Sequence, residues 1–407
     1  MRGLTKDKLL SLAEEFGGAF YLLDSCQFQA NYTRLSDEFK KIYGNFNIAY
    51  SYKTNYTPKL CKIVNENGGY AEVVSHMEAE IALRSGVHPS RIIWNGPIKN
   101  TDKVNELLLS GATVNLDSVY EFHNIVSLAE KHPEVTLNVG IRCNFDVGDG
   151  VVSRFGIDTD SDEFDRALEL FVSHKNIYLV NLQCHFAKRN VEFWPARAEG
   201  MVKTAKRVEK ALGYLPRRID IGGGIYGNME DELKAQFTAN IAGYADYAKA
   251  AATVFKKHFP DEEPELVIEP GSALAGDCMQ FAGCVETIKT VRGKTYITML
   301  GSQKNISMSG INPPMRVISM GGEATDFTDA DIVGYTCIEG DVMYRGFNGR
   351  LAVGDFLVFS NCGSYSLVMK PPFIFPNFPV LDICREEVEV IKKQETFDDI
   401  FHTFSFR

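Results

Sequence analysis

Residues 49–55 read AYSYKTN and close an apolar run that begins at Tyr43. The run is β-prone apart from Gly44 and two asparagines, and Pro58 then opens a helical pattern. This stretch predicts a buried β-strand that ends on Lys53. A lysine at the end of a core strand is desolvated, and desolvation favours the neutral amine that a Schiff base requires. Taken alone, the stretch also fits a strand-end lysine whose ammonium group reaches solvent.

Composition narrows the class of protein. The chain has 407 residues, which allows two domains because single cores stop growing at ~250–300 residues. Its net charge of -10 argues against nucleic acid or an anionic membrane surface as the main partner. No apolar run approaches the ~20 residues that span a bilayer, and the polar N-terminus lacks the apolar region of a signal peptide. We therefore expect a cytoplasmic protein.

The nine cysteines are scattered and include no Cys-x-x-Cys pair. This usage fits free thiols in a reducing cytosol better than a disulfide framework. Cysteines and histidines do not cluster at the spacing of zinc ligands, so no metal site is expected.

Short β-rich runs alternate with helical stretches through the first two-thirds of the chain. Eight such runs over roughly 230 residues are typical of an α/β chain folded as a (β/α)8 TIM-like barrel. A doubly wound open sheet is the alternative, but the count of eight and the polar residues at the strand ends favour the barrel. The runs lie at 46–53, 69–75, 91–95, 112–117, 136–143, 178–186, 217–222 and 264–269. The helical stretches between them lie at 57–67, 77–85, 101–110, 119–131, 161–174, 194–212 and 235–259.

The pattern changes after about residue 275, where strand-like runs alternate with Gly-rich turns. These runs lie at 278–290, 295–299, 334–338 and 356–360, and the closing stretch 385–401 is charged and partly helical. We therefore predict a cofactor-binding barrel at 26–275. Residues 1–25 join 276–407 in a mostly β domain that contributes substrate-site and dimer residues.

Chemically versatile residues follow four of the predicted barrel strands. Active-site groups of such barrels lie at the C-terminal ends of the strands. Lys53 follows the first strand, His185 the sixth, residues 222–224 the seventh and Glu269 the eighth. Each has a role if the ligand is pyridoxal 5′-phosphate. Lys53 forms the Schiff base, His185 stacks on the ring, the glycines bring N–H groups to the phosphate, and Glu269 pairs with the ring nitrogen.

Each signal has a plainer interpretation when taken alone. Three glycines in a row are most often a turn, a strand-end histidine is more often structural than catalytic, and Glu-Pro-Gly is usually a turn. Their occurrence together, in this order at the ends of strands one, six, seven and eight, makes chance a poor explanation.

With these residues in place, the chain resembles the fold-type III pyridoxal-phosphate-dependent decarboxylases. This family includes diaminopimelate, ornithine and arginine decarboxylases, and the likeness is nearest to the diaminopimelate branch and covers nearly the whole chain. The segments that carry it are 52–55 (lysine motif), 183–186 (stacking histidine), 220–224 (phosphate glycines), 269–271 (pyridine-nitrogen glutamate), 337–341 (Cys-x-x-x-Asp) and 363–365 (Gly-Ser-Tyr here, Gly-Ala-Tyr in the family).

The resemblance implies decarboxylation at the α-carbon of an amino acid. It assigns Lys53, His185 and Cys337 to catalysis, and it adds Gly222, Gly223, Gly224, Glu269, Gly271 and Tyr365 as cofactor ligands. In the family the cysteine comes from the partner subunit, so a homodimer with shared active sites is implied. Glu339 and Asp341 are expected near the substrate.

The sequence departs from the family where the substrate or phosphate is bound. Ser272 stands where the family has arginine, and we expect Arg189 or Lys188 to supply the missing cation unless they form a solvated basic loop. Asn312 stands where the diaminopimelate enzymes carry an arginine that binds the distal end of the substrate. Diaminopimelate is therefore a doubtful substrate, and a modified or carrier-attached amino acid is the favoured expectation.

Two other functions are open to the same sequence. An amino-acid racemase on this fold needs a second base on the opposite face of the substrate, whereas the segment 337–341 favours decarboxylation. A regulatory homologue without cofactor has no reason to retain Lys53, His185, Glu269 and Tyr365 together.

Overall fold

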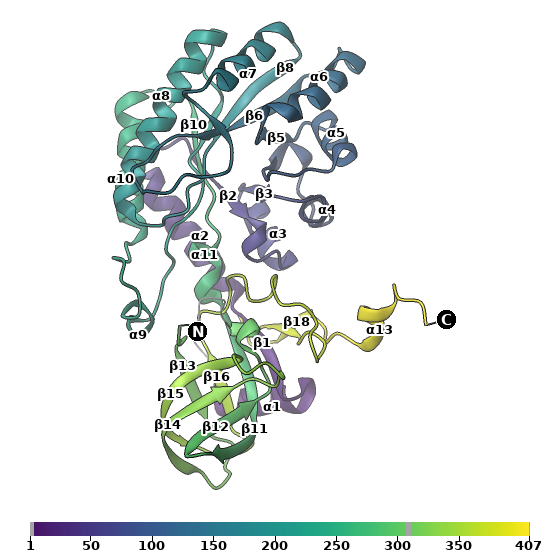
Figure 1. Cartoon of the computed structure of the whole chain (residues 1–407), viewed down its shortest axis with the longest axis vertical. Helices are drawn as coiled ribbons and strands as arrows, with labels where there is room; N and C mark the ends of the chain where they lie inside the picture. The colour runs from purple at the N-terminus through teal and green to yellow at the C-terminus, as the bar shows by residue number, and fades with distance from the viewer. Residues whose placement is uncertain (1–3, 307–310, 407) are drawn as a thin grey trace. The chain divides into compact units, whose positions relative to one another are not determined.

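The computed structural model describes residues 4–306 and 311–406, which form two compact units (Figure 1). The barrel unit contains 31–227 and 239–273, and the β unit contains the residues up to 30, 228–238 and those from 274 onward. The segment 228–238 therefore groups with the β unit, whereas the sequence had assigned it to the barrel.

Eight parallel strands close the barrel. Each strand pairs with its neighbour in the chain order of the barrel strands, and the last returns to the first, with Ile268 opposite Ile48. This closure confirms the predicted barrel and excludes the open sheet. The strands are β2 (Phe46–Ser51), β3 (Tyr70–Val73), β4 (Ile92–Trp94), β5 (Thr113–Leu116), β6 (Leu137–Asn144), β8 (Ile177–Gln183), β9 (Arg218–Asp220) and β10 (Glu265–Ile268).

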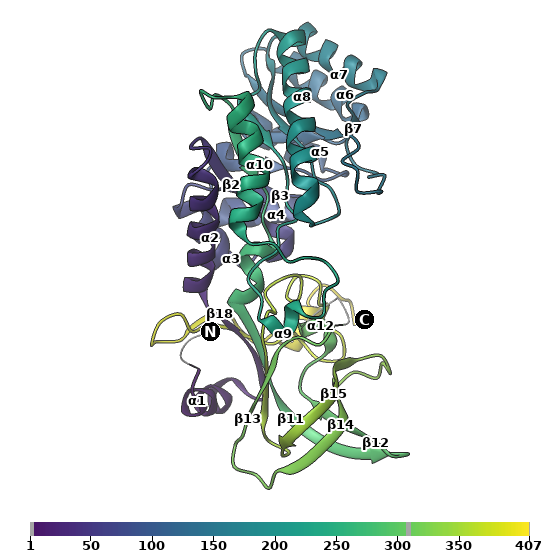
Figure 2. The same cartoon turned by 90° about the vertical axis from the view of Figure 1, so that its left-hand side faces the viewer.

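Helices cover the outside of these strands, and α8 and α10 lie side by side there (Figure 2). Local signals begin several of them: Pro58 opens α3, Ser75 caps α4 and Asn100 caps α5. The main helices are α2 (Ser25–Lys40), α3 (Pro58–Glu66), α4 (His76–Arg84), α5 (Thr101–Leu109), α6 (Phe122–Lys131), α7 (Asp162–Ser173), α8 (Trp194–Leu212) and α10 (Tyr244–His258).

The predicted helix over 235–259 was too long. Only α9 (Asp231–Lys234) and α10 are helical in this region, and α10 begins after Gly243. The Asp246 carboxylate accepts a hydrogen bond from the Gly243 N–H at 2.9 Å, which caps the helix at that point.

The β unit is built around the N-terminal strand β1 (Ala19–Leu23). This strand pairs antiparallel with β11 (Met279–Val291) and parallel with β17 (Val380–Asp382), so distant parts of the chain share one sheet. Helix α1 (Lys6–Phe16) packs Leu9 and Leu12 against the core of this unit. The other elements are β12 (Lys294–Met299), α12 (Gln303–Ile306), β13 (Met315–Ile318), β14 (Thr325–Val333), β15 (Val342–Leu351), β16 (Phe356–Phe359), β18 (Glu389–Lys392) and α13 (Phe397–Phe401).

The strand predicted at 334–338 is wrong, because these residues form the loop between β14 and β15. The buried Asp341 carboxylate holds this loop. It accepts hydrogen bonds from Thr336 Oγ1 at 2.6 Å, Ser302 Oγ at 3.0 Å and the Gln303 N–H at 2.7 Å. These contacts tie the loop to the start of α12 and satisfy the buried carboxylate.

The expectation of unpaired cysteines is wrong at one pair. Cys26 and Cys384 form a disulfide although 358 residues separate them, and both lie in the β unit. Their approach depends on β1 pairing with β17, which spacing in the sequence does not reveal.

No helix in the described part of the chain is both long and apolar enough to cross a bilayer.

Candidate active site

Lys53 lies directly after β2, in a short 3-10 turn that spans Tyr52–Thr54. Its side chain is 34% exposed, its Nζ forms an ion pair with the Glu72 carboxylate, and it also donates to Ser51 Oγ at 3.2 Å. Glu72 stands opposite Ser51 in the β2–β3 register and is buried. The sequence argument considered desolvation alone, whereas the fold also gives Lys53 an anionic partner.

Glu72 is a site residue that the prediction did not include. Burial by itself raises the pKa of this carboxyl, but the Lys53 charge and hydrogen bonds from Lys53, Ser51 and Asn95 outweigh burial and hold the pKa below its usual range. The available signal was a carboxylate at the end of the second predicted strand, where barrel active-site groups lie.

A buried hydrogen-bond network connects Glu72 with Glu269. The Asn95 amide donates to Glu72 Oε1 at 3.0 Å and to Glu269 Oε1 at 2.5 Å. The Gln183 amide donates to both Glu269 oxygens, at 3.2 and 3.1 Å, and Asn115 donates to Asn95 Oδ1 at 2.7 Å. These amides fix the Glu269 carboxyl at the end of β10 and couple it to the neighbourhood of Lys53.

Glu269 is 3% exposed and lies near two other buried carboxyls, Asp220 and Glu72. Burial and the neighbouring negative charges raise the pKa of Glu269 well above its usual range, and burial raises the pKa of Asp220 to about 7. A cation placed beside Glu269 would offset the cost of a negative charge on this buried carboxyl. The barrel interior is therefore suited to a protonated ring nitrogen.

His185 follows β8 and contacts the glycine turn. The Gly223 N–H donates to His185 Nδ1 at 3.1 Å, so the neutral ring carries its proton on Nε2. Burial, Lys53 and Arg197 lower the pKa of His185 well below its usual range, which keeps the ring neutral. A neutral imidazole is suited to lie against an aromatic ring.

The turn at 222–224 requires glycine. A Cβ at Gly222 would lie 2.1 Å from the Cys184 carbonyl oxygen, and one at Gly223 would lie 2.2 Å from the Glu269 carbonyl oxygen. Gly222 and Gly224 also have positive φ angles of 72° and 92°. This close approach brings the β8, β9 and β10 ends together.

The N–H groups of the turn are not equivalent. Gly222 donates to Asp220 Oδ1 at 2.9 Å and Gly223 donates to His185, so these two are already used. Among the described residues, no partner accepts from the N–H of Gly224 or Ile225. The sequence had assigned all three glycine N–H groups to an anion, whereas the structure leaves Gly224 and Ile225 for that role.

Arg189 and Gly271 complete the surroundings of this turn. Arg189 Cγ lies 3.8 Å from the position a Gly224 Cβ would take, so Arg189 packs against the turn, while Lys188 is exposed. A Cβ at Gly271 would lie 1.9 Å from Thr54 Oγ1, which explains glycine there and places β10 close to the Lys53 turn.

Comparison with known proteins shows the family of the chain. The family described as "Pyridoxal-dependent decarboxylase, pyridoxal binding domain" matches residues 29–276, more than half of the chain. The chain belongs to the pyridoxal-dependent decarboxylases. It is an enzyme that decarboxylates an amino acid, and the comparisons give no support to the racemase alternative.

The relatives of this decarboxylase cover it almost completely. The diaminopimelate decarboxylase of Methanothermobacter thermautotrophicus is 27% identical over 96% of this chain and 92% of the relative. The crystal structure of diaminopimelate decarboxylase from Methanocaldococcus jannaschii has a TM-score of 0.83 at 22% identity, covering 98% and 94% of the two chains. The arginine decarboxylase of Paramecium bursaria Chlorella virus has a TM-score of 0.75 at 20% identity, covering 93% and 100%. These structural likenesses establish the fold of the decarboxylase.

The remaining predicted residues lie in the β unit of the decarboxylase. Cys337 and Glu339 are exposed on the loop between β14 and β15. Tyr365 has a φ angle of 63°, a strained conformation for a residue other than glycine. Five other non-glycine residues of the described chain share a positive φ, so this conformation does not single out Tyr365, and its cofactor contact stays a prediction.

Two predicted substrate residues are already engaged within the β unit. Asp341 is buried by the loop contacts described above. The side-chain amide of Asn312 donates to the Arg345 carbonyl oxygen and accepts from the Arg345 N–H, both at 3.0 Å. The Asn312 backbone pairs in the same way with the side-chain amide of Gln236. These contacts occupy the Asp341 carboxylate and the Asn312 amide within the β unit, and the substrate role of both residues stays a prediction.

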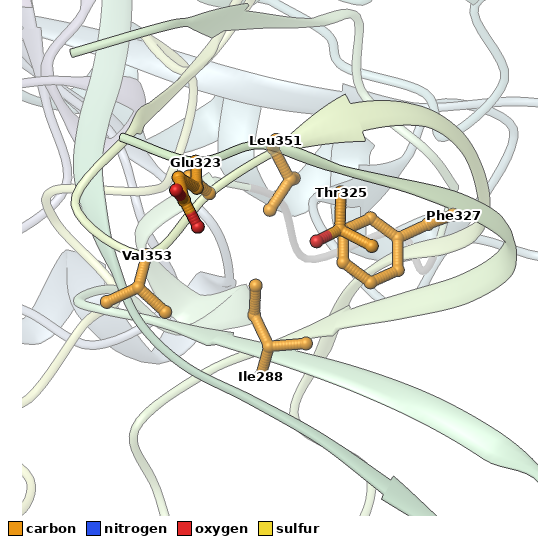
Figure 3. Close-up of a pocket in the computed structure, with 7 residues that line it drawn as sticks. Ile288, Glu323, Thr325, Phe327, Leu351 and Val353 are labelled. Atoms are coloured by element: carbon orange, nitrogen blue, oxygen red, sulfur yellow. The ribbon is translucent and has the colours of Figure 1, made fainter. Parts of the chain in front are cut away.

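A separate cavity of about 410 Å³ lies in the β unit (Figure 3). Its seven lining residues include one carboxylate and no lysine, so it cannot hold a cofactor by a Schiff base. They are Ile288, Glu323, Thr325, Phe327, Leu351, Ala352 and Val353.

The buried carboxyl of Glu78 should make the stability of the barrel depend on pH. Burial raises the pKa of this α4 carboxyl to about 7, although the Val74 N–H, 2.7 Å away, opposes the shift. A glutamate in an unfolded chain titrates near ~4.3, so between pH ~5 and ~7 the folded state holds a proton that the unfolded state has lost. We expect the free energy of unfolding to fall as pH rises through this window, by about 2–4 kcal/mol for this group.

Denaturant titration of the cofactor-free protein from pH 5 to pH 8 measures this effect. Glu78→Gln should flatten the profile, while Glu80→Gln on the same helix should leave it unchanged. An unaltered slope in Glu78→Gln would contradict the assignment.

Proposed function

We propose that this decarboxylase binds pyridoxal 5′-phosphate in the barrel, with Lys53 as the covalent attachment point. The residues present fit that group in two ways. Gly224 and Ile225 carry N–H groups without partners among the described residues, and Glu269 is a buried carboxyl suited to a cationic neighbour.

When bound, the cofactor supplies an electron sink for the bond between the α-carbon and the carboxylate. The chain's own residues then have defined tasks. Glu269, held by Asn95 and Gln183, keeps a proton at the ring nitrogen, and neutral His185 lies against the ring. Glu72 would hold the Lys53 ammonium whenever the lysine is released from the cofactor.

The substrate is proposed to be an amino acid other than diaminopimelate, either modified or attached to a carrier. Ser272 and Asn312 replace two arginines of the diaminopimelate branch, and the Asn312 amide is paired with the Arg345 backbone. Without these cations the site lacks the partners that a second charged end would need. We place the reaction in the cytoplasm.

A homodimer with shared active sites is proposed from the exposed loop at 337–341. Cys337 and Glu339 are exposed there, so a second copy could reach them to complete its site. Cys337 would protonate the α-carbon after carbon dioxide leaves.

Complementation between two inactive variants tests this arrangement. Lys53→Ala and Cys337→Ala should each be nearly inactive, but the pair, unfolded and refolded together, should recover about one quarter of wild-type activity, because half of the dimers contain one intact site. The same mixture prepared without unfolding is the control. Absence of recovery, with dimers present by light scattering, would show that each site uses one chain.

The test of the function itself uses purified protein, cofactor and deuterated water. A panel of L- and D-amino acids, including diaminopimelate, ornithine, lysine, arginine and glutamate, is analysed by mass spectrometry. Loss of carbon dioxide with gain of one deuterium supports the proposal and names the substrate class. Deuterium gained at the α-carbon with the carboxylate retained would instead indicate a racemase. Absence of any reaction with bound cofactor would favour a carrier-attached substrate.

A further inference from the structure

Arg197 is a buried cation that the reaction described above does not use. It lies in the first turn of α8 with 0% of its surface exposed, between the rings of Trp194 and Phe186, whose centroids are 4.6 and 5.6 Å from the guanidinium carbon. No carboxylate pairs with it in the described part of the chain, and its Nε has no hydrogen-bond partner. Burial of an unpaired charge is costly, so another contribution must favour an arginine here.

The hydrogen bonds of Arg197 all go to backbone carbonyls around the glycine turn. One guanidinium nitrogen donates to the carbonyl oxygens of Gly223 at 2.7 Å and Ile221 at 3.3 Å. The other donates to the Lys188 carbonyl oxygen at 3.4 Å. A single side chain therefore connects the turn after β9 to the loop after β8.

The contact with Gly223 also determines where the next N–H points. The Gly223 carbonyl and the Gly224 N–H belong to one peptide unit, and the described chain contains no cis peptide bond. In a trans peptide the two groups point in opposite directions, so a carbonyl directed at Arg197 turns the Gly224 N–H away from it. A cation that binds the carbonyl polarises the peptide and strengthens this N–H as a donor.

We propose that Arg197 is the positioning residue of an anion site for a phosphomonoester, acting through the Gly223–Gly224 peptide and supplying the positive charge that Ser272 lacks. Arg189 is also close to the turn, since its Cγ lies 3.8 Å from the position that a Gly224 Cβ would take, whereas Arg197 binds the turn through the Gly223 carbonyl. This inference rests on the proposed binding of a phosphorylated pyridoxal.

The experiment compares two ligands that differ only in the phosphate. Dissociation constants of pyridoxal 5′-phosphate and of pyridoxal are measured by absorbance and fluorescence for apo-protein of wild type, Arg197→Lys and Arg197→Met. Inhibition of cofactor binding by inorganic phosphate is measured in parallel. Arg207→Met, an arginine of the same helix that contacts Thr159 and Asp165, is the matched control.

We expect Arg197→Met to raise the dissociation constant of pyridoxal 5′-phosphate by about 10- to 100-fold and to leave that of pyridoxal unchanged. Arg197→Lys keeps the charge but not the forked donors, so its affinity for pyridoxal 5′-phosphate should lie between those of wild type and Arg197→Met. The lysine variant also provides the test if the methionine variant does not fold. The affinity for inorganic phosphate should fall in the same order.

Two results would overturn the inference. Unchanged affinity for the phosphorylated ligand in both variants would remove any role for Arg197. Equal losses for both ligands would show a purely structural role, because such a role cannot select for phosphate. Wild-type protein that binds neither ligand would instead refute the proposed function on which the inference depends.

Discussion

Lys53→Ala will abolish covalent attachment of the cofactor and lower kcat by at least about a thousandfold. Lys53 is the lysine at the mouth of the barrel whose Nζ lies beside the Glu72–Asn95–Glu269 network. Removing it takes away both the attachment point and the amine next to the α-carbon. The visible band of the bound cofactor and its retention after borohydride reduction, followed by peptide mass spectrometry, measure the loss.

The controls separate chemistry from folding. Lys62→Ala removes an exposed lysine of α3 and should behave as wild type. Lys53→Ala leaves Glu72 buried without its cation, which costs roughly 1–3 kcal/mol or more, so the double variant with Glu72→Gln should regain stability but not activity. Borohydride-stable labelling of Lys53→Ala at another lysine would disprove the assignment.

Glu269→Gln will lower kcat by about 100- to 1,000-fold with a smaller change in cofactor affinity. The carboxyl is held by two amides and is buried beside Asp220, so its oxygen atoms have a defined place and a cation beside it would be stabilised. A glutamine has nearly the same shape but cannot keep a proton at a ring nitrogen. The electron sink is then weaker while the other contacts of the cofactor remain.

Single-turnover release of carbon dioxide measures this effect apart from binding. Glu265→Gln is a close control. Glu265 begins β10, four positions before Glu269, and its carboxylate accepts hydrogen bonds from Asn47 and Tyr70 instead. A Glu269→Gln enzyme with wild-type turnover would mean that the ring nitrogen has another partner.

Much of the barrel could be predicted because its determinants are local. Alternation of β-prone runs with helical periods located all eight strands, and the rule that active-site groups follow parallel strands identified Lys53, His185, residues 222–224 and Glu269. The β unit was less predictable. Its strands pair across long sequence distances, and the apolar run at 334–338 is a loop because Asp341 binds Thr336 and Ser302.

The sequence by itself determined the barrel and the order of its chemical groups, since strand periodicity and chain order suffice for both. Only the tertiary structure decided which groups meet. Glu72 reaches Lys53 through the β2–β3 register, Asn95 links two carboxyls from different strands, and Arg197 contacts a turn 24 to 26 residues farther along. These partners follow from packing and register, and desolvation inside the barrel then sets their charge states.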